Sequence, residues 1–387
     1  MVAPPLAGYE AVYVAMGAAL LLSVPALLDA DAAAMRAGLW PVVVAVILMC
    51  LATLPHAVTP LNWVGVGIVA LALLAAGPVG ALLHTPRLVT PIMIAALCLA
   101  GACLGATAGL LEYFSGAGRS GVGNNPIHYA GIVVILGFSA LAGFPSTRNP
   151  WRYLFFLGPA CAFAAALVSG SRGPMLAAIA LTAVTGTILL VWNRKDHRFL
   201  LAAGLFALAG GGAIYLAGDG ARAISGLYGL ISGADAGTAG SDTIRKAMYE
   251  AGVLAFLDSP VWGHGYANLM DAATSASPNG DLIARFDHLH NDVADFAVAG
   301  GALGIAAYAM LLLAPLMPLR RLGQTPSRPA ILLGIVVSLS YLTLGMTNAM
   351  IGVLPQTMLF AVLVGAVIVL DMSERDPRAL MQRDGAQ

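Results

Sequence analysis

The chain has 387 residues, of which 59% are hydrophobic and only 10% are charged, and its formal net charge is zero. Soluble globular proteins carry about 25% charged residues, so this composition and a mean hydropathy of +0.85 exclude an ordinary soluble domain. No basic stretch is interleaved with aromatic residues, which argues against a nucleic-acid-binding protein.

Continuous apolar runs of about 18 to 25 residues predict an all-α, polytopic integral membrane protein, because a helix of that length crosses a bilayer. We expect about eleven transmembrane helices, within a range of roughly 10 to 12, in a single transmembrane domain over residues 1–387. In chain order the expected spans occupy residues 9–28, 39–54, 61–83, 88–111, 125–145, 151–169, 173–192, 198–218, 292–319, 329–347 and 352–371. The four cysteines lie inside these runs without disulfide or zinc spacing, and we interpret them as small core residues.

Basic residues gather in the loops on one side of these alternating spans. They are Arg36, Arg87, Arg148, Arg152, Arg194, Lys195, Arg198, Arg320, Arg321, Arg328, Arg375, Arg378 and Arg383. The positive-inside rule predicts that this side is cytoplasmic. The opposite side then receives residues 112–124, the short break at 169–173 and the long segment 219–291.

The segment 219–291 is predicted to form a helical loop subdomain inserted before the last three spans. A glycine- and serine-rich stretch at 232–241 is expected to be flexible. Residues 242–257 have the apolar spacing of a helix, with Arg245 and Tyr249 on a second face.

Two further features follow that helix. Gly263 and Gly265 flank His264 in a predicted turn, which leaves this histidine conformational freedom. Residues 271–281, rich in serine, asparagine and glycine, are predicted to be loop.

A histidine stands at the mouth of the next apolar run. His290 precedes the expected helix start, and a neutral imidazole can take a proton at physiological pH, so His290 is a candidate catalytic base, favoured over His288. Asn291, Asp292 and Asp295 are expected to support it, with either aspartate able to orient its ring. The alternative is that these residues only cap and solvate the helix start, with Asn291 or Asp292 as the N-cap.

Three arginines are expected on the same side of the membrane as His290. Arg172 lies between two apolar runs, where a charge must snorkel, pair with an acid or bind an anion. Arg245 belongs to the predicted helix, and Arg119 lies in a glycine-rich loop of the kind that cradles anions. Guanidinium groups bind phosphate through two parallel hydrogen bonds, so these three arginines suit a pyrophosphate group. The alternatives are a snorkelling arginine at 172 and a solvated helix face at 245.

Two other kinds of protein are less favoured. A metal site formed by His264, His288, His290, Asp287 and Asp292 lacks a third ligand at a diagnostic spacing, so no metal is expected. No acidic residue lies near the middle of a predicted span, which disfavours a proton-coupled transporter.

As a set, the motifs of this chain resemble the O-antigen ligase and O-antigen polymerase superfamily of bacterial polysaccharide assembly. The resemblance covers most of residues 110–345 and is carried by Ser171-Arg172-Gly173, by Arg245 followed by Pro260-Val261-Trp262-Gly263-His264-Gly265-Tyr266, and by His290-Asn291-Asp292 leading into Ala299-Gly300-Gly301-Ala302-Leu303-Gly304. The long segment before the last three spans also corresponds to the large periplasmic loop of that family. The family usually has about twelve spans and a cytoplasmic N-terminus, from which our count of about eleven departs.

The resemblance implies an inverting, metal-independent glycosyltransferase of the bacterial inner membrane that needs no cofactor. Its donor would be an undecaprenyl-pyrophosphate-linked glycan, and its acceptor a hydroxyl of lipid A-core at the periplasmic face. By position, Arg172 and Arg245 would hold the pyrophosphate and His290 would activate the acceptor hydroxyl. A polymerase that extends the growing glycan on its carrier is the alternative within the superfamily. A transporter or flippase for a lipid-linked sugar is the alternative outside it.

Overall fold

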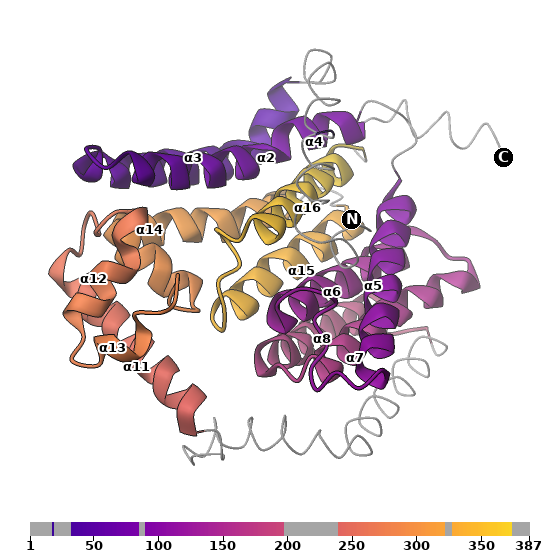
Figure 1. Ribbon diagram of the computed structural model, residues 1–387. Coiled ribbons are helices and arrows are strands. Elements are labelled where there is room, and N and C mark those ends of the chain that lie inside the picture. The colour runs from indigo at the N-terminus through magenta and orange to yellow at the C-terminus, as the bar shows by residue number, and fades with distance from the viewer. Residues whose placement is uncertain (1–17, 19–31, 85–89, 197–238, 322–326, 374–387) are drawn as a thin grey trace. The chain divides into compact units, whose positions relative to one another are not determined.

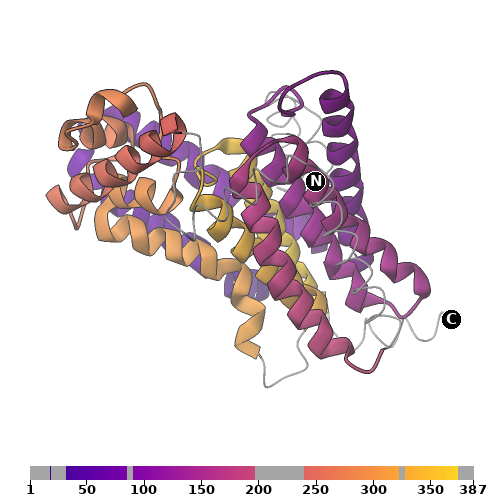
Figure 2. The ribbon, with the colours of Figure 1, turned by 90° about the horizontal axis from the view of Figure 1, so that it is seen from below.

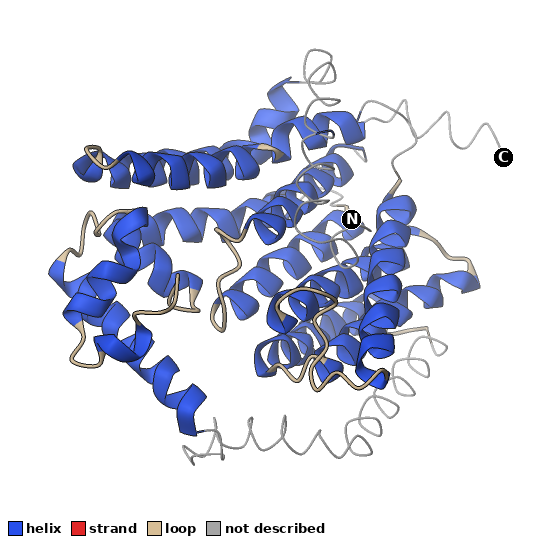
Figure 3. Ribbon diagram, viewed as in Figure 1, coloured by secondary structure: helices blue, strands red, loops and turns tan. Residues whose placement is uncertain are grey.

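The computed structural model describes residue 18 and residues 32–84, 90–196, 239–321 and 327–373. Within these ranges every regular element is a helix, as Figure 3 shows. Nine stretches of the described residues are long and apolar enough to cross a membrane. They are Gly38–His56, Pro60–Leu83, Pro91–Phe114, Pro126–Ser146, Pro150–Val168, Arg172–Asn193, Asp292–Arg320, Arg328–Gly345 and Leu354–Met372. Each matches one expected span, and the other two expected spans, 9–28 and 198–218, lie outside the described residues. The all-α, polytopic class is confirmed.

The chain forms two compact units. Among the described residues, unit 1 comprises 90–196, and unit 2 comprises 18, 32–84, 239–321 and 327–373. The assignment of residues 1–387 to one domain, with the segment 219–291 as an inserted subdomain, stays a prediction.

Unit 1 is built from helices that pack closely through small residues. Its elements are α5 (Pro91–Phe114), α6 (Pro126–Ser139), η2 (Ala140–Ser146), η3 (Pro150–Phe156), α7 (Leu157–Val168) and α8 (Arg172–Asn193). A Cβ atom on Gly137 of α6 would lie 2.3 Å from the carbonyl oxygen of Gly158 in α7. Glycine therefore lets the two helix backbones touch, as is common between transmembrane helices.

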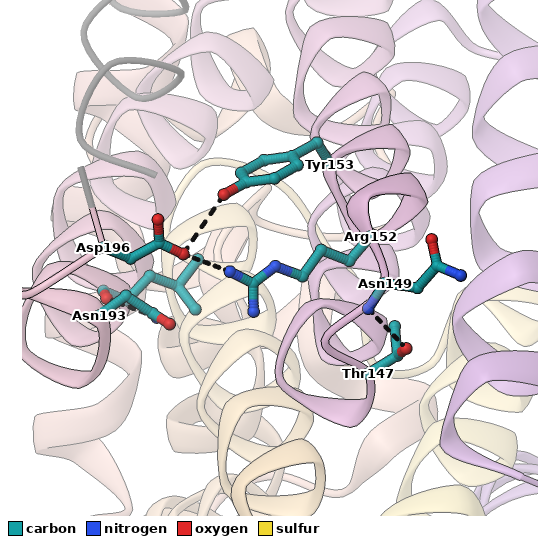
Figure 4. A network of polar contacts seen from close by, with 7 residues as sticks. Thr147, Asn149, Arg152, Tyr153, Asn193 and Asp196 are labelled. Carbon is teal, nitrogen blue, oxygen red and sulfur yellow. Dashed lines mark hydrogen bonds and ion pairs between the residues drawn. The ribbon is translucent and has the colours of Figure 1, made fainter. Parts of the chain in front are cut away.

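A polar network joins η3 to the segment after α8 at one end of unit 1 (Figure 4). The guanidinium of Arg152 pairs with the carboxylate of Asp196, which also accepts a 3.3 Å hydrogen bond from the Tyr153 hydroxyl. Arg152 also lies over the Phe144 ring, 4.5 Å from its centroid. The two basic loops that flank α7 and α8 therefore lie at the same end of the unit, as the topology prediction requires. Which end faces the cytoplasm stays a prediction.

Unit 2 contains the remaining helices, in two groups along the chain. The first group is α2 (Ala32–Thr53), η1 (Leu54–His56), α3 (Pro60–Leu74) and α4 (Ala76–His84). The second group is α11 (Ala239–Asp258), η4 (Tyr266–Asn268), α12 (Leu269–Ala276), α13 (Gly280–Ile283), α14 (Asp292–Leu313), η5 (Ala314–Arg321), α15 (Arg328–Gly345) and α16 (Leu354–Ser373). Figures 1 and 2 show α11, α12 and α13 gathered beside one end of α14.

The small helices beside α14 confirm one prediction and correct another. The helix predicted at 242–257 is α11, which already begins inside the stretch 232–241, the rest of which lies outside the described residues. The loop predicted at 271–281 is wrong, because most of it is the helices α12 and α13. Their apolar residues join a buried cluster with α11 and α14, and this tertiary packing outweighs the polar composition. The cluster consists of Ala247, Met248, Ala251, Ala255, Leu269, Ala273, Ile283, Leu289 and Val298.

Candidate functional site

The transmembrane helix α14 has a non-helical residue in its middle, and the turn after α11 supplies hydrogen bonds to the backbone there. Gly301 has φ 58° and ψ −142°, outside the helical region. The carbonyls of Val298 and Ala299 therefore accept hydrogen bonds from the amides of His264 and Gly265, at 2.9 and 3.0 Å. An irregular backbone at membrane depth needs such partners, because lipid offers none.

Glycines make this docking possible. A Cβ atom on Gly263 would lie 2.5 Å from the backbone of Ala299, and one on Gly301 would lie 2.5 Å from the backbone of Val261. Both glycines also have positive φ, 67° and 58°. The turn after α11 and the glycines of α14 are thus two halves of one backbone joint, which the sequence motifs anticipate only as separate features.

The joint places a cavity of about 320 Å³ beside α14. The cavity is mostly apolar along α2, α3 and α14, apart from Thr53 and Asp295, and it is polar where residues 266 and 287–288 close it. Its polar lining residues include Tyr266, Asp287, His288 and Asp295. Burial raises the pKa of Tyr266 to about 12, with the two nearby aspartates of α14 adding to the shift, so its hydroxyl keeps its proton at neutral pH.

His290 stands next to this cavity in a restrained conformation. Its φ is 53°, a left-handed value that is uncommon for a residue with a side chain. Its Nδ1 lies 2.8 Å from Oδ1 of Asn348, in the loop between α15 and α16. The rings of His288 and His290 are 4.3 Å apart, and Phe286 packs on the edge of His290 at 5.5 Å. His290 is therefore held in place by Asn348 and by the rings of Phe286 and His288.

His288 is the histidine that lines the cavity itself. Burial, followed by the neighbouring His290, lowers its pKa to about 4, so its ring is neutral at physiological pH. Sequence position alone does not reveal which histidine lines the cavity, because the two have the same side chain and differ only in the direction that the loop gives to each ring.

The supporting polar residues act on the backbone. Asn291 is the N-cap of α14, and its side chain accepts a 3.2 Å hydrogen bond from the amide of Ala294. Asp292 is fully buried and accepts hydrogen bonds from the backbone amides of Met350 and Ile351. Asp295 accepts a 2.8 Å hydrogen bond from the backbone amide of Leu289. The expectation that an aspartate orients the His290 ring is wrong, because the carboxylates hold the two loops and Asn348 holds the ring.

Arg245 lies on the face of α11 that meets the loop carrying Asn348. Tyr249, one turn later on the same face, donates a 3.4 Å hydrogen bond to the carbonyl of Met346. The side-chain nitrogen of Asn291 donates a 3.4 Å hydrogen bond to the same carbonyl. Within the described residues Arg245 forms no ion pair.

In unit 1 the structure brings Arg119 to the Arg172 motif. The guanidinium of Arg119 donates to the carbonyl of Ser169 at 2.9 Å and to the hydroxyl of Ser171 at 3.0 Å. Arg172 is the first residue of α8, with Ser171 as the N-cap residue. The loop of residue 119 and the break at 169–173 therefore lie at one end of the unit.

The glycine-rich loop around Arg119 already holds an anion, and it belongs to the protein. Oε2 of Glu112 accepts hydrogen bonds from the amides of Gly121 and Val122, at 2.8 and 2.6 Å. The loop resembles an anion cradle as expected, but the carboxylate of Glu112 fills it. Arg119 consequently acts in the structure as a clamp between this loop and residues 169–171.

His264 also differs from its expectation. Its Nε2 lies 2.8 Å from the carbonyl of Ala255, and its amide binds α14, so the predicted freedom of this residue is wrong.

Over the described residues no three His, Cys, Asp or Glu side chains lie close enough to hold a metal ion. Sequence reasoning missed Asn348, whose signal is a polar residue within a short break between two apolar runs.

Comparison with known proteins fits this arrangement. Residues 157–309 match the model of a family described as O-antigen ligase. The matched stretch contains Arg172, Arg245, the turn at Gly263 and Gly265, and His290. No curated protein matches the chain. Over residues 157–309, this polytopic membrane protein is similar to the O-antigen ligase family.

Proposed function

We propose that this protein transfers a glycan from an undecaprenyl-pyrophosphate carrier to a hydroxyl of lipid A-core, at the periplasmic face of the bacterial inner membrane. The observation that carries the proposal is His290, held by Asn348 beside a cavity and with the Arg245 face of α11 turned toward the same loop. The matched family supports a reaction of the ligase or polymerase type.

The proposed reaction is a single displacement. His290 takes the proton of the acceptor hydroxyl, and the oxygen attacks the anomeric carbon of the donor sugar. The bond between that carbon and the pyrophosphate oxygen breaks, and the carrier pyrophosphate leaves with the electron pair. Attack opposite the leaving group inverts the anomeric configuration.

Arginines supply the electrostatic part of this proposal. Negative charge develops on the leaving pyrophosphate, and fixed guanidinium groups stabilise it without a metal ion or a cofactor. Arg245 and Arg172 are the proposed ligands of the pyrophosphate. Arg119 supports Arg172 through its hydrogen bonds to Ser169 and Ser171.

The function is tested in a strain deleted for this gene and complemented with variants, by comparing glycolipid profiles. His290→Ala should lower transfer about 10²–10⁴-fold at normal membrane expression. Lipid A-core without long chains, with lipid-linked polymer accumulating, indicates a ligase. A single repeat unit on the core indicates a polymerase instead. Near wild-type chains with His290→Ala would refute the proposed base.

The arginines are tested with a matched pair on α11. Arg245→Ala should abolish transfer, whereas Lys246→Ala, an exposed neighbour on the same helix, should leave it unchanged. Arg172→Lys keeps the charge but loses the planar fork, so it should also impair transfer. Normal transfer by both Arg172→Ala and Arg245→Ala would show that the pyrophosphate assignment is wrong. Purified enzyme should also keep its activity in EDTA; loss that zinc reverses would revive the metal site.

The proposed membrane side has its own test. Asp281 in α13 and Arg320 in η5 are both exposed and belong to segments expected on opposite sides. In intact spheroplasts an impermeant maleimide should label Asp281→Cys and spare Arg320→Cys, with the unmodified chain as background. The reverse pattern would overturn the topology.

A further inference from the structure

Asn348 occupies a position that the reaction scheme leaves unexplained. It lies in the break between α15 and α16 and is 1% exposed. Its side-chain oxygen is 2.8 Å from Nδ1 of His290, which is 58 residues away in the chain. An amide oxygen only accepts hydrogen bonds, so this contact requires the proton of a neutral His290 to be on Nδ1.

A second observation concerns the nitrogen of the Asn348 side-chain amide. Nδ2 of Asn348 and Nε2 of His288 are both buried without a hydrogen-bond partner among the described residues. Both side chains lie against the ring of His290, since Oδ1 of Asn348 is 2.8 Å from its Nδ1 and the centroid of the His288 ring is 4.3 Å from its own. An unpaired buried polar atom costs about 1–3 kcal/mol, so two complementary ones in one place indicate a pair. The amide nitrogen can only donate, and a neutral ring nitrogen without a proton can accept.

We propose that Asn348 is a positioning residue that fixes the tautomers of both histidines. Nδ1–H of His290 donates to Oδ1 of Asn348, and Nδ2–H of Asn348 donates to Nε2 of His288. His290 is left with Nε2 unprotonated, and this is the nitrogen that accepts the proton of the acceptor hydroxyl. This last step rests on the proposed function, whereas the tautomers do not.

The choice of an amide has a consequence for basicity. Asparagine orients the ring without placing a negative charge beside it. An aspartate at this position would orient the ring and add a negative charge that stabilises the protonated form, and it could not donate to His288. The two functions of Asn348 can therefore be separated by substitution.

Three segments near His290 carry charged or titratable residues. They are Asp287 and His288 in its own segment, Asp292 and Asp295 in α14, and Arg245, Lys246 and Glu250 in α11. The loop of residues 346–353 that carries Asn348 has no titratable side chain. Any change in the titration of His290 on substitution of Asn348 therefore reports on that residue, because the other groups remain in place.

The tautomers are tested directly by ¹⁵N NMR of the full chain, with ring-labelled histidine, in detergent micelles or nanodiscs. His288→Gln and His290→Gln assign the two signals among the seven histidines of the chain. Both rings should carry their proton on Nδ1 in the unmodified protein, and Asn348→Leu should release both into mixtures. Asn348→Asp should raise the titration midpoint of His290 by about one pH unit or more. Thr347→Val, which changes the neighbouring residue, should change neither signal.

Activity gives the second arm, in right-side-out membranes of the complemented deletion strain, which carry their own donor and acceptor. Asn348→Leu should lower transfer at least about tenfold, which is less than the loss of about 10²–10⁴-fold expected when the general base itself is removed. Asn348→Asp should retain transfer, with the acidic limb of its pH profile moved upward. The inference would be refuted if the neutral His290 ring carries its proton on Nε2, or if Asn348→Leu leaves both tautomers unchanged. If His290→Ala is inactive while Asn348→Leu is normal, the positioning role fails and the proposed function stands. If His290→Ala is active, the proposed function fails while the tautomer result is judged separately.

Discussion

The two units of this protein solve a similar problem in different ways. Each has a glycine-rich segment whose backbone groups need partners. In unit 1 charged side chains supply them, because Glu112 binds the amides of Gly121 and Val122 and Arg119 binds the carbonyl of Ser169. In unit 2 the partners of the broken α14 are other backbone groups, from the turn after α11.

The difference decides which charges are available for chemistry. In unit 1 the acid and one arginine are used to hold the fold. In unit 2 the joint is made by backbone groups and by the side chains of His56 and Ser259, which hydrogen-bond to the carbonyl of Gly263, so it uses neither Arg245 nor His290. A glycine-rich stretch beside an arginine therefore does not by itself indicate a ligand site.

The largest expected effect comes from breaking the backbone joint of unit 2. Gly301→Ala places a Cβ atom 2.5 Å from the backbone of Val261 at a positive φ, so we expect a loss of about 3 kcal/mol or more. Thermal unfolding and the yield of monodisperse protein measure it. Gly67→Ala in α3 is the matched control, since its Cβ meets nothing within 4 Å, and helix propensity should stabilise it slightly. Equal behaviour of the two variants would show that the joint is not needed.

Next in size is removal of the internal anion of unit 1. Glu112→Ala should lower stability by about 1–3 kcal/mol, because two partly buried amides lose a charged acceptor. The emptied loop should then bind inorganic phosphate, which would raise the unfolding temperature of Glu112→Ala but not of the unmodified protein. A phosphate effect of equal size in both proteins would show that the Glu112 carboxylate does not fill the cradle.

The pH dependence of unit 2 is expected to be smaller. The pKa of His288 is about 4 in the folded protein, below the ordinary value of about 6.5, so between these values the unfolded chain binds more protons. Stability is fully present above about pH 6.5 and is lost as the pH falls toward 4, by about 1–2 kcal/mol after allowing for partial exposure. Denaturant unfolding at several pH values measures it. His288→Gln should flatten the curve over this window, and an unchanged curve would contradict the assignment.

The smallest expected effects compare the two arginines directly. Arg119→Ala should lower stability by about 0.5–1.5 kcal/mol, because it loses hydrogen bonds to Ser169 and Ser171. Arg245→Ala should change stability by less than about 0.5 kcal/mol, since no ion pair is lost among the described residues. Chemical denaturation of both variants measures the difference. A larger loss for Arg245→Ala would mean that its charge holds the fold.

Much of this architecture follows from the sequence, because its causes are local. Apolar runs of bilayer length predict the nine described spans, and an asparagine before an apolar run predicts the N-cap of α14. The helix at 242–257 follows from its own periodicity. The loop predicted at 271–281 fails for the opposite reason, since α12 is held by a cluster assembled from distant segments.

The sequence by itself determines an all-helical membrane protein and the residue types from which its site is made. Only the tertiary structure decides which of these residues are used to hold the fold and which are left for chemistry. Asn348 and His290 are 58 residues apart, and the turn at Gly263 meets α14 more than thirty residues later, so no local pattern reveals either contact. The physical reason is that a buried polar group takes whichever partner the packed helices bring within hydrogen-bond distance.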